Sequence, residues 1–421
     1  MISKIAPRTT LHVIKSTQFK TIEINFHFIE PLNAHRLSAR SLLASVLESR
    51  SADFTSQAAM AAKLAQLYGA GFSINVAKNG TYSFLTVRLV LVNPRFLPTQ
   101  SSLVTDGLHF IYQVLQRPYL VNGHFDEQVV QRERTNLLAY LRAAQDDKQF
   151  YANLMAQAYY YQTTAQQTPS FGDAQVVQHL QASDLMDAYQ SLFTEDQVVI
   201  EVLGDVDEQT VLQGLTPFQW GQLPLTLPTI FYHQPLQKQQ TRRLYLPRVQ
   251  QGKLSLVYQV PAYFYQHNYP AWLVTNALFG GTTQSLLFLH VREQQQLAYY
   301  ADSTLDPFCG ALLVQSGIDA HDYQQVVATI QQQVQLLRDG QITATLLQQN
   351  KQSLLNDFVM HLDTSRNLLN RALYADLLRQ HLPDVSEFTT LINAVTIADV
   401  QACAAQMQLQ VQLCVMNEED Q

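Results

Sequence analysis

The sequence predicts an α+β protein with two homologous lobes, in each of which helices pack on one face of a mostly antiparallel sheet. Three observations support this prediction. The chain has 421 residues, of which 47% are hydrophobic and only 14% are charged, so it can bury two ordinary domain cores. The same order of predicted elements occurs twice along it. A proline-containing segment of broken periodicity separates the two occurrences.

The first half is predicted to contain a strand, two helices and a β-hairpin, in that order. Their ranges are Thr21 to Phe28, Ala39 to Leu47, Ser56 to Tyr68, and the hairpin strands Gly69 to Ala77 and Ser83 to Leu91. Alternating apolar residues favour the strands, and apolar residues recurring every three or four positions favour the helices. Asn79-Gly80 between the last two strands is a strong turn signal.

The second half repeats this order. Its ranges are Lys253 to Val260 for the strand, Pro270 to Leu278 and Gln284 to Arg292 for the helices, and Leu297 to Ser303 with Gly310 to Gly317 for the hairpin. The two hairpins align closely, because Leu64 to Phe72 lies over Val291 to Tyr299. The repeated order therefore predicts two copies of one fold.

Each half continues with helices and closes with an apolar strand. The ranges are Gln100 to Leu115, Arg132 to Tyr160 and Gln197 to Leu203 in the first half, and Asp322 to Leu337, Gln349 to Leu378 and Gln408 to Met416 in the second. Gly204 to Asp207 caps one more helix. The prolines after Leu215 suit a semi-rigid linker. We therefore expect a first lobe at residues 1–213, a linker at 214–243 and a second lobe at 244–421.

Charge and cysteine usage restrict the function. A formal charge of -7 without any Lys/Arg-rich run argues against a nucleic-acid partner. Met1 to Thr21 has no apolar run of the kind found in secretory signals, and no stretch is apolar enough to span a membrane. The three cysteines lack CxxC spacing, which fits a reducing compartment. These observations predict a cytoplasmic protein without a membrane partner.

One segment of the second half combines glycines, a helix and two hydrogen-bond donors. Gly280 and Gly281 form a turn, an amphipathic helix follows and ends in Arg292, and a strand opens at Leu297-Ala298-Tyr299. Arg292 and Tyr299 are seven residues apart. An arginine is an always-charged fork and a tyrosine is a directional donor, so the pair suits binding to carbonyl oxygens or to an oxyanion.

This segment resembles the second-domain signature of the pitrilysin or insulinase family of zinc peptidases. The resemblance covers nearly the whole chain and implies two lobes joined like a clamshell. It also implies that Arg292 and Tyr299 bind a peptide substrate, while Gly280 and Gly281 let backbone approach backbone. The stretch Glu293 to Gln296 departs from the family, which usually has basic and glycine residues there. This departure leaves the fine specificity open.

Each of these residues also has a structural explanation. Arg292 suits the C-terminus of a helix, where a cation is favoured by the helix dipole. Tyr299 suits a strand aromatic packed under a loop. Gly280 and Gly281 suit an ordinary tight turn. Their combination in one segment favours the functional interpretation.

The zinc motif that the resemblance leads us to expect is absent. Active members carry HxxEH on the first helix of the first lobe, with a distant glutamate as the third ligand. In this chain the HxxEH positions fall on Ser41, Ala44 and Ser45, and the third falls near Ala139 or Tyr140. None of the twelve histidines belongs to an HxxEH or HExxH motif. We therefore expect no metal and no cofactor in this chain, and no peptide hydrolysis by it alone.

Two further clusters have both functional and structural interpretations. Asp146-Asp147-Lys148 is similar to a segment common in bacterial relatives, but a solvated helix end explains it better. Tyr159 to Tyr161 suits a helix face packed on the sheet, with the wall of a peptide chamber as the alternative.

A chain with the substrate-binding pair and without the zinc motif resembles the non-catalytic subunit of a two-chain peptidase. The resemblance implies a heterodimer whose partner carries HxxEH and the zinc, acting on a peptide or unfolded segment. Residues 125–129, 146–148 and 315–319 are similar to those of bacterial pitrilysin-like proteins associated with aminopentanol modification of elongation factor P. The alternative is a scaffolding protein of the same fold, like the core subunits of the respiratory bc complex.

Overall fold

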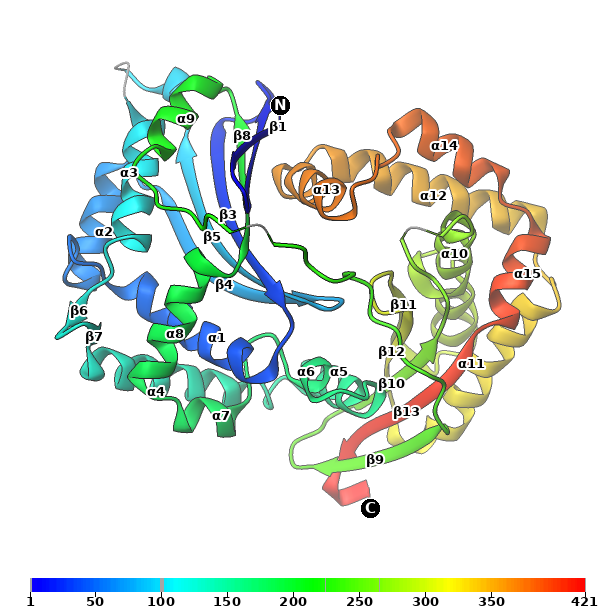
Figure 1. Ribbon diagram of the computed structural model, residues 1–421. Helices are drawn as coiled ribbons and strands as arrows, with labels where there is room; N and C mark the ends of the chain where they lie inside the picture. The colour runs from blue at the N-terminus through cyan, green and yellow to red at the C-terminus, as the bar shows by residue number, and fades with distance from the viewer. Residues whose placement is uncertain (1, 99–101, 224, 265, 421) are drawn as a thin grey trace. The chain divides into compact units, whose positions relative to one another are not determined.

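A computed structural model describes residues 2–98, 102–223, 225–264 and 266–420 (Figure 1). It divides into two compact units, and neither is continuous in sequence. Unit 1 comprises Met1–Arg142, Thr168–Ile230 and Thr364–Gln380, and unit 2 comprises Ala143–Gln167, Phe231–Asp363 and His381–Gln421. Each unit therefore contains one helical segment from the other half of the sequence. The predicted division into a lobe at 1–213, a linker at 214–243 and a lobe at 244–421 remains a prediction about the sequence repeat.

Unit 1 is built on a six-stranded sheet in the order β1-β2-β8-β3-β5-β4. The strands are β1 (Ile2–Ala6), β2 (Thr9–Lys15), β3 (Thr21–Pro31), β4 (Gly71–Asn79), β5 (Tyr82–Val92) and β8 (Gln197–Gly204). The β2–β8 pair is parallel and every other pair in this sheet is antiparallel. A small ribbon of β6 (Leu120–Val121) and β7 (His124–Phe125) lies apart from it.

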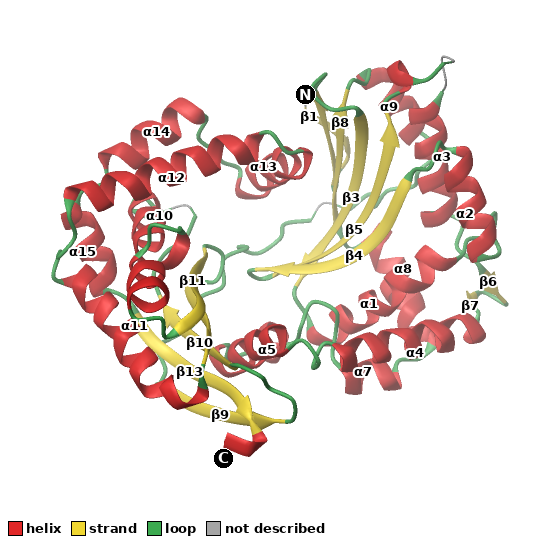
Figure 2. Ribbon diagram, turned by 180° about the vertical axis from the view of Figure 1, so that it is seen from behind, coloured by secondary structure: helices red, strands yellow, loops and turns green. Residues whose placement is uncertain are grey.

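Most helices of unit 1 cover one face of this sheet (Figure 2). They are α1 (Ala34–Ser49), α2 (Gln57–Gln66), α3 (Leu103–Leu115), α4 (Glu127–Ala143), α7 (Ala174–His179), α8 (Ala182–Thr194) and α9 (Glu208–Leu215), with a 3-10 turn at Pro94–Phe96. Asn33 starts α1, because its side chain accepts hydrogen bonds from the backbone of His35 and Arg36. The predicted start of α3 at Gln100 lies outside the described residues.

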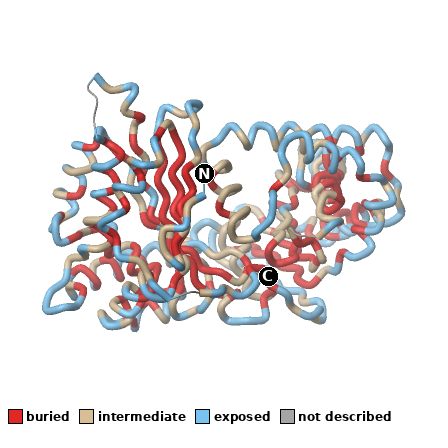
Figure 3. The backbone as a smooth tube through the Cα atoms, turned by 45° about the horizontal axis from the view of Figure 1, so that its top comes forward, coloured by how far each residue is buried: buried red, intermediate tan, exposed pale blue. Residues whose placement is uncertain are grey.

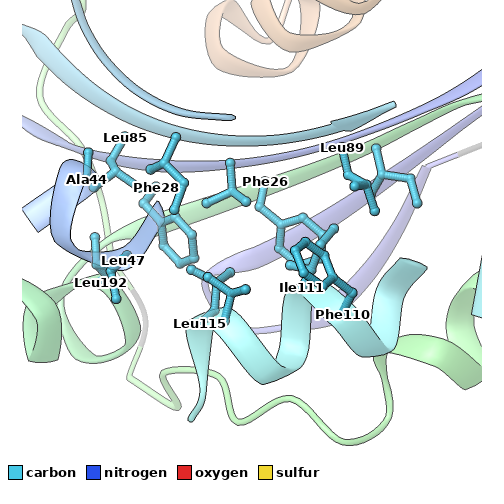
Figure 4. Close-up of a cluster of buried hydrophobic side chains, with 14 of the residues drawn as sticks. Phe26, Phe28, Ala44, Leu47, Leu85, Leu89, Phe110, Ile111, Leu115 and Leu192 are labelled. Atoms are coloured by element: carbon cyan, nitrogen blue, oxygen red, sulfur yellow. The ribbon is translucent and has the colours of Figure 1, made fainter. Parts of the chain in front are cut away.

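The core of unit 1 lies between these helices and one face of the sheet (Figure 4), and the strands of this sheet are largely buried (Figure 3). Ile22, Ile24, Phe26 and Phe28 of β3 are fully buried on this face. Phe110, Ile111 and Leu115 of α3 contribute to the same cluster. Each such side chain stabilises the fold by roughly 1.5–3 kcal/mol through burial, which holds the helices on the sheet.

Unit 2 repeats the strand order of unit 1. Its sheet runs β11-β12-β10-β13-β9, with β9 (Gln240–Leu246), β10 (Gly252–Gln259), β11 (Ala298–Asp306), β12 (Ala311–Ile318) and β13 (Gln408–Asn417). Here β9 and β13 form the parallel pair, as β2 and β8 do in unit 1. Five strands therefore follow one topology twice, which confirms two homologous lobes; β1 is an addition to the first.

The helices of unit 2 also lie mainly on one face of its sheet. They are α10 (Tyr269–Asn276), α11 (Tyr323–Arg338), α12 (Ala344–Leu362), α14 (Val385–Ala394) and α15 (Ile397–Ala405), with π-helical segments Ala277–Gly281 and Leu287–Gln294 and 3-10 turns Ala320–Asp322 and Glu418–Asp420. In the described part of the chain, no single helix is long and apolar enough to cross a membrane. The bent pair α14 and α15 passes that length and composition test only when taken together.

Each sheet also carries one helix on its other face. In unit 2 this is α5 (Lys148–Tyr160), which is followed by the short α6 (Thr164–Gln167). In unit 1 it is α13 (Ser365–Leu378). The fold class is confirmed, with this helix as an addition to the predicted single helical layer.

Five strands, five helices and two helix breaks were not predicted. Strands β1 and β2 precede the first predicted strand, β6 and β7 follow α3, and β9 begins inside the predicted linker. The helices α6, α7, α8, α14 and α15 lie outside every predicted range. The helical region predicted at Arg132 to Tyr160 is interrupted before Asp147, whose carboxylate caps α5. The region predicted at Gln349 to Leu378 is interrupted before Thr364, which caps α13. The chain passes from one unit to the other at both breaks.

Candidate functional site

Ser41, Ala44 and Ser45 lie along one side of α1 and line a cavity of about 450 Å³ in unit 1. Glu48 extends this lining by one helical turn, and Tyr140 of α4 contributes to it as well. The remaining lining residues are Ile74, Asn75, Val76, Asn136, Leu137, Ser170 and Phe171. The structure therefore brings together the predicted motif positions and Tyr140; Ala139 is not in the lining.

The polar groups of the two serines are bound to backbone carbonyls. Ser41 Oγ donates to Leu37 O at 3.0 Å or to Ser170 O at 3.1 Å, and Ser45 Oγ lies 3.4 Å from Ser41 O. Ala44 has no polar side-chain atom. Zinc sites in proteins use thiolate, imidazole or carboxylate ligands, so these three positions do not fit the ion.

Two carboxylates lie near this cavity, but they do not complete a metal site. Glu48 accepts a hydrogen bond from Ile74 N at 3.2 Å, and its pKa is raised mainly by burial. Glu133 of α4 contributes to that rise by repulsion, and it is paired with Arg132 at 2.6 Å. Among the described residues, no group of three or more His, Cys, Asp or Glu side chains could hold a metal ion.

A buried ion network holds the start of α1, and sequence analysis did not find it. Arg40 is 0% exposed and contacts Asp196 at 2.6 Å and Glu30 at 2.8 Å. Arg36 contacts the second oxygen of Glu30 at 2.6 Å. Burial raises the pKa of Glu30 to about 7, and Arg40 and Arg36 offset part of that rise. The network fixes α1 to the ends of β3 and α8.

The predicted substrate-binding segment lies in unit 2, where two glycines allow a close approach. A Cβ atom on Gly280 would lie 2.7 Å from Ser303 N on β11, and one on Gly281 would lie 2.7 Å from Asn276 Nδ2. Ser303 Oγ in turn donates to Asn276 Oδ1 at 2.8 Å. Any larger residue at Gly280 would push the π-helical segment away from β11.

Arg292 lies near the end of the second π-helical segment, with 43% of its side chain exposed. Its guanidinium carbon is 4.7 Å from the centroid of the Phe288 ring, and its Nε is 3.6 Å from a Glu293 oxygen. Both contacts are with its own helical segment, which restricts the side chain without burying it. The guanidinium can therefore still reach a ligand.

Tyr299 lies on a β-bulge of β11, and it is 65% exposed. Its neighbours Ala298 and Tyr300 pair with Ile318 and Gly317, so Tyr299 is the extra residue without a partner on β12. Strand β11 is also the last strand in its sheet. The hydroxyl of Tyr299 is therefore presented to solvent, which does not fit an aromatic packed under a loop.

Tyr300, the next residue along β11, is held in place by side-chain contacts, and sequence analysis missed its role. Its hydroxyl donates to Gln149 Oε1 of α5, and its ring lies against Gly317, where any Cβ would clash with it. The Lys253 ammonium lies 5.4 Å from the centroid of the same ring. The adjacent tyrosines were visible in the sequence, but the bulge at Tyr299 was not.

The two remaining clusters have structural roles. Asp147 accepts hydrogen bonds from the backbone of Gln149 and Phe150, so it caps α5. Tyr160 and Tyr161 are buried against the sheet of unit 2 with ring centroids 5.0 Å apart. Burial raises the pKa of both tyrosines. The packing interpretation of Tyr159 to Tyr161 therefore fits this geometry better than an open chamber wall.

Comparisons with known proteins agree with this architecture. Residues 179–354 match the family model described as "Peptidase M16 inactive domain". The chain is 30% identical over 401 residues to "Probable inactive metalloprotease YmfF" of Bacillus subtilis, covering 95% of this chain and 94% of that protein. The match to the inactive domain supports the prediction that this chain is not itself a peptidase.

Solved structures share the fold of this chain. The crystal structure of a conserved protein from Enterococcus faecalis superimposes with a TM-score of 0.92 at 34% identity, covering 99% of this chain and 98% of that one. The peptidase M16 inactive domain from Pseudomonas fluorescens has a TM-score of 0.81 at 16% identity, covering 99% and 97%. Together with the relative from Bacillus subtilis and the matching family model, this confirms the predicted family: the chain belongs to the M16, or pitrilysin, family of peptidases.

Proposed function

We propose that this chain is the non-catalytic subunit of a two-chain zinc peptidase and supplies Arg292 and Tyr299 to the substrate of a partner that carries HxxEH. The observation that carries the proposal is the exposure of Tyr299 on a bulge that Tyr300, Gly317 and Gln149 hold in place. An exposed tyrosine contributes little to stability, so stability alone does not explain why the backbone that carries Tyr299 is held in place by these contacts.

The two side chains suit different moments of peptide cleavage. The Arg292 guanidinium donates to a carbonyl oxygen of the bound peptide, which lowers the free energy of both the ground state and the transition state. The Tyr299 hydroxyl donates to the oxygen that becomes negative when water attacks the scissile carbonyl. The zinc of the partner would activate that water.

The partner is tested by affinity purification of the tagged chain from its own cells, followed by mass spectrometry. We expect a chain of similar length with an intact HxxEH, and one zinc per heterodimer by elemental analysis. Recovery of a membrane complex, or of the chain paired only with itself, would favour the scaffolding alternative.

The purified chain alone should contain no stoichiometric zinc and should cleave no peptide. Introducing Ser41→His, Ala44→Glu and Ser45→His together should not restore hydrolysis, because Tyr140 offers no third carboxylate and the supporting shell is absent. One zinc per unmodified chain would contradict the proposal.

The resemblance at residues 125–129, 146–148 and 315–319 further leads us to propose a cytoplasmic role connected with elongation factor P modification. The test is the aminopentanol content of elongation factor P in cells that lack this chain. We expect the modification to be incomplete, and an unchanged content would remove this part of the proposal.

A further inference from the structure

The face of the unit 1 sheet that lies under α13 is polar, although much of it is buried. On β3, Glu23, Asn25 and His27 alternate with the core residues and are each at most 6% exposed. Asn25 pairs with Glu201 of β8 on one side and with Arg88 of β5 on the other. One row of side chains across three strands is therefore polar, which is costly for a surface that only holds a helix.

Ion pairs and hydrogen bonds connect much of this face. Arg88 donates to both oxygens of Glu23, at 2.6 and 3.0 Å. His27 Nε2 lies 2.9 Å from Glu201 Oε2, and its Nδ1 lies 2.9 Å from Thr86 Oγ1. These contacts fix the directions of the side chains around Asn25.

Helix α13 does not fill the space above this face. A cavity of about 490 Å³ lies between α13 and the strands, within the size range of small-ligand pockets. Polar side chains supply most of its lining, and four of them are the carboxamides of Asn25, Asn75, Asn79 and Asn370. Asn79 also donates to the Tyr374 hydroxyl of α13 at 2.6 Å.

Two side chains of this cavity have unused hydrogen-bonding or ionic capacity. Asn25 is only 6% exposed, and its Oδ1 accepts no hydrogen bond from any described residue. Arg366, at the start of α13, has no ion-pair partner among the described residues. An acceptor on the strand floor and a cation on the helix therefore face one polar space.

The equivalent face in unit 2 is a natural control. There α5 and the strands meet mainly through apolar side chains, which are Ala152, Ala156, Val257, Val411, Leu413 and Val415, and hydrogen bonds from Ser255 to Asn153 and from Tyr300 to Gln149 add to this contact. The same architecture can thus be closed by a mainly apolar contact, so the polar face of unit 1 is not a requirement of the fold.

We propose that the cavity under α13 binds a short peptide with free termini. The carboxamides match the donors and acceptors of peptide groups, Asn25 Oδ1 accepts from the ligand's nitrogen, and Arg366 pairs with its terminal carboxylate. This site lies beyond the proposed function, because it uses none of the Arg292–Tyr299 segment.

The test is calorimetric titration of the full chain with trialanine, with N-acetyl-trialanine amide as the blocked control. We expect saturable binding of trialanine at one site and binding of the blocked form weaker by about tenfold or more, since charge-assisted bonds are lost. Absence of saturable binding up to about 10 mM, or equal binding of the blocked form, would overturn the proposal.

Substitutions of residues that line the cavity test whether the ligand binds there. Arg366→Ala and Asn370→Ala should each weaken binding, by about tenfold for the charged residue, whereas the exposed control Arg142→Ala should not. Asn25→Leu should weaken binding while keeping or raising the thermal midpoint, because an apolar side chain removes a buried unpaired acceptor. Retained binding in both Arg366→Ala and Asn370→Ala would contradict the assignment.

Failure of this site is distinguishable from failure of the proposed function. Arg292→Ala and Tyr299→Phe should leave trialanine binding unchanged. If either variant abolished it, the peptide would lie at the other segment and the cavity under α13 would not be its site.

Discussion

The two repeats place different residues at the same point of the same hairpin. Phe72 pairs with Leu89 in the unbroken β4–β5 ladder, and its ring packs edge-to-face on Phe110 at 5.0 Å. Tyr299, which aligns with Phe72, has no ladder partner and is 65% exposed. One bulge thus converts a position that stabilises the first lobe into one that presents a hydroxyl in the second.

This comparison extends to the helices before each hairpin. In the first lobe, α1 is fixed by the buried ions Glu30, Arg40 and Asp196, and the candidate motif positions are inert. In the second lobe, Gly280 lets a π-helical segment lie close to β11, and Arg292 remains exposed. We therefore expect substitutions in the first segment to reduce stability and those in the second to reduce function.

The largest stability effect is expected for Arg40→Met. It leaves Asp196 and part of Glu30 without a counter-ion in a buried site, which should lower the free energy of unfolding by about 3–5 kcal/mol. Urea denaturation of the purified chain measures this. A loss below about 1 kcal/mol would mean that the ions do not hold α1.

A pH dependence should come from Glu30. Its folded pKa of about 7 lies above its ordinary value of 4.5, so between these values the folded state holds a proton that the unfolded state has lost. The free energy of unfolding should therefore fall as the pH rises through that window, by up to about 3 kcal/mol. The control is denaturation of the Glu30→Gln variant across the same pH range. If its free energy of unfolding fell with pH as steeply as that of the unchanged chain, the pH dependence would come from another group.

The matched pair Phe72→Ala and Tyr299→Ala sharpens the hairpin comparison. Removing the partly buried Phe72 ring should cost about 2 kcal/mol, because its contact with Phe110 is lost. Removing the exposed Tyr299 side chain should change stability by less than about 0.5 kcal/mol. Equal losses in the two variants, measured by thermal unfolding, would contradict the difference in their roles.

Periodicity predicted strands and helices whose signals are local. It did not predict which unit each helix belongs to. The β3 strand and both hairpins were predictable because alternation and the Asn79-Gly80 turn are local signals. The short β1 and β9 carry weaker patterns at the sheet edges. The sequences of α13 and α5 do not indicate that α13 packs in unit 1 and α5 in unit 2, because an amphipathic face does not specify which sheet it contacts.

The candidate site was predictable in its residue types and not in its geometry. The spacing of Arg292 and Tyr299 was readable, and so was the absence of HxxEH around Ser41. The bulge depends on pairing with β12 and on contacts of Tyr300 with α5, which are distant in sequence. Long-range contacts of this kind leave no periodic signal.

Turnover of the reconstituted pair with Tyr299→Phe tests the proposed role most directly. Tyr68→Phe, at a tyrosine that is 50% exposed in the first repeat, is the matched control. We predict that Tyr299→Phe slows cleavage about a hundredfold, equivalent to about 3 kcal/mol for one oxyanion donor, with unchanged folding and partner binding. Full activity in a well-folded Tyr299→Phe pair would contradict the claim that this chain takes part in catalysis.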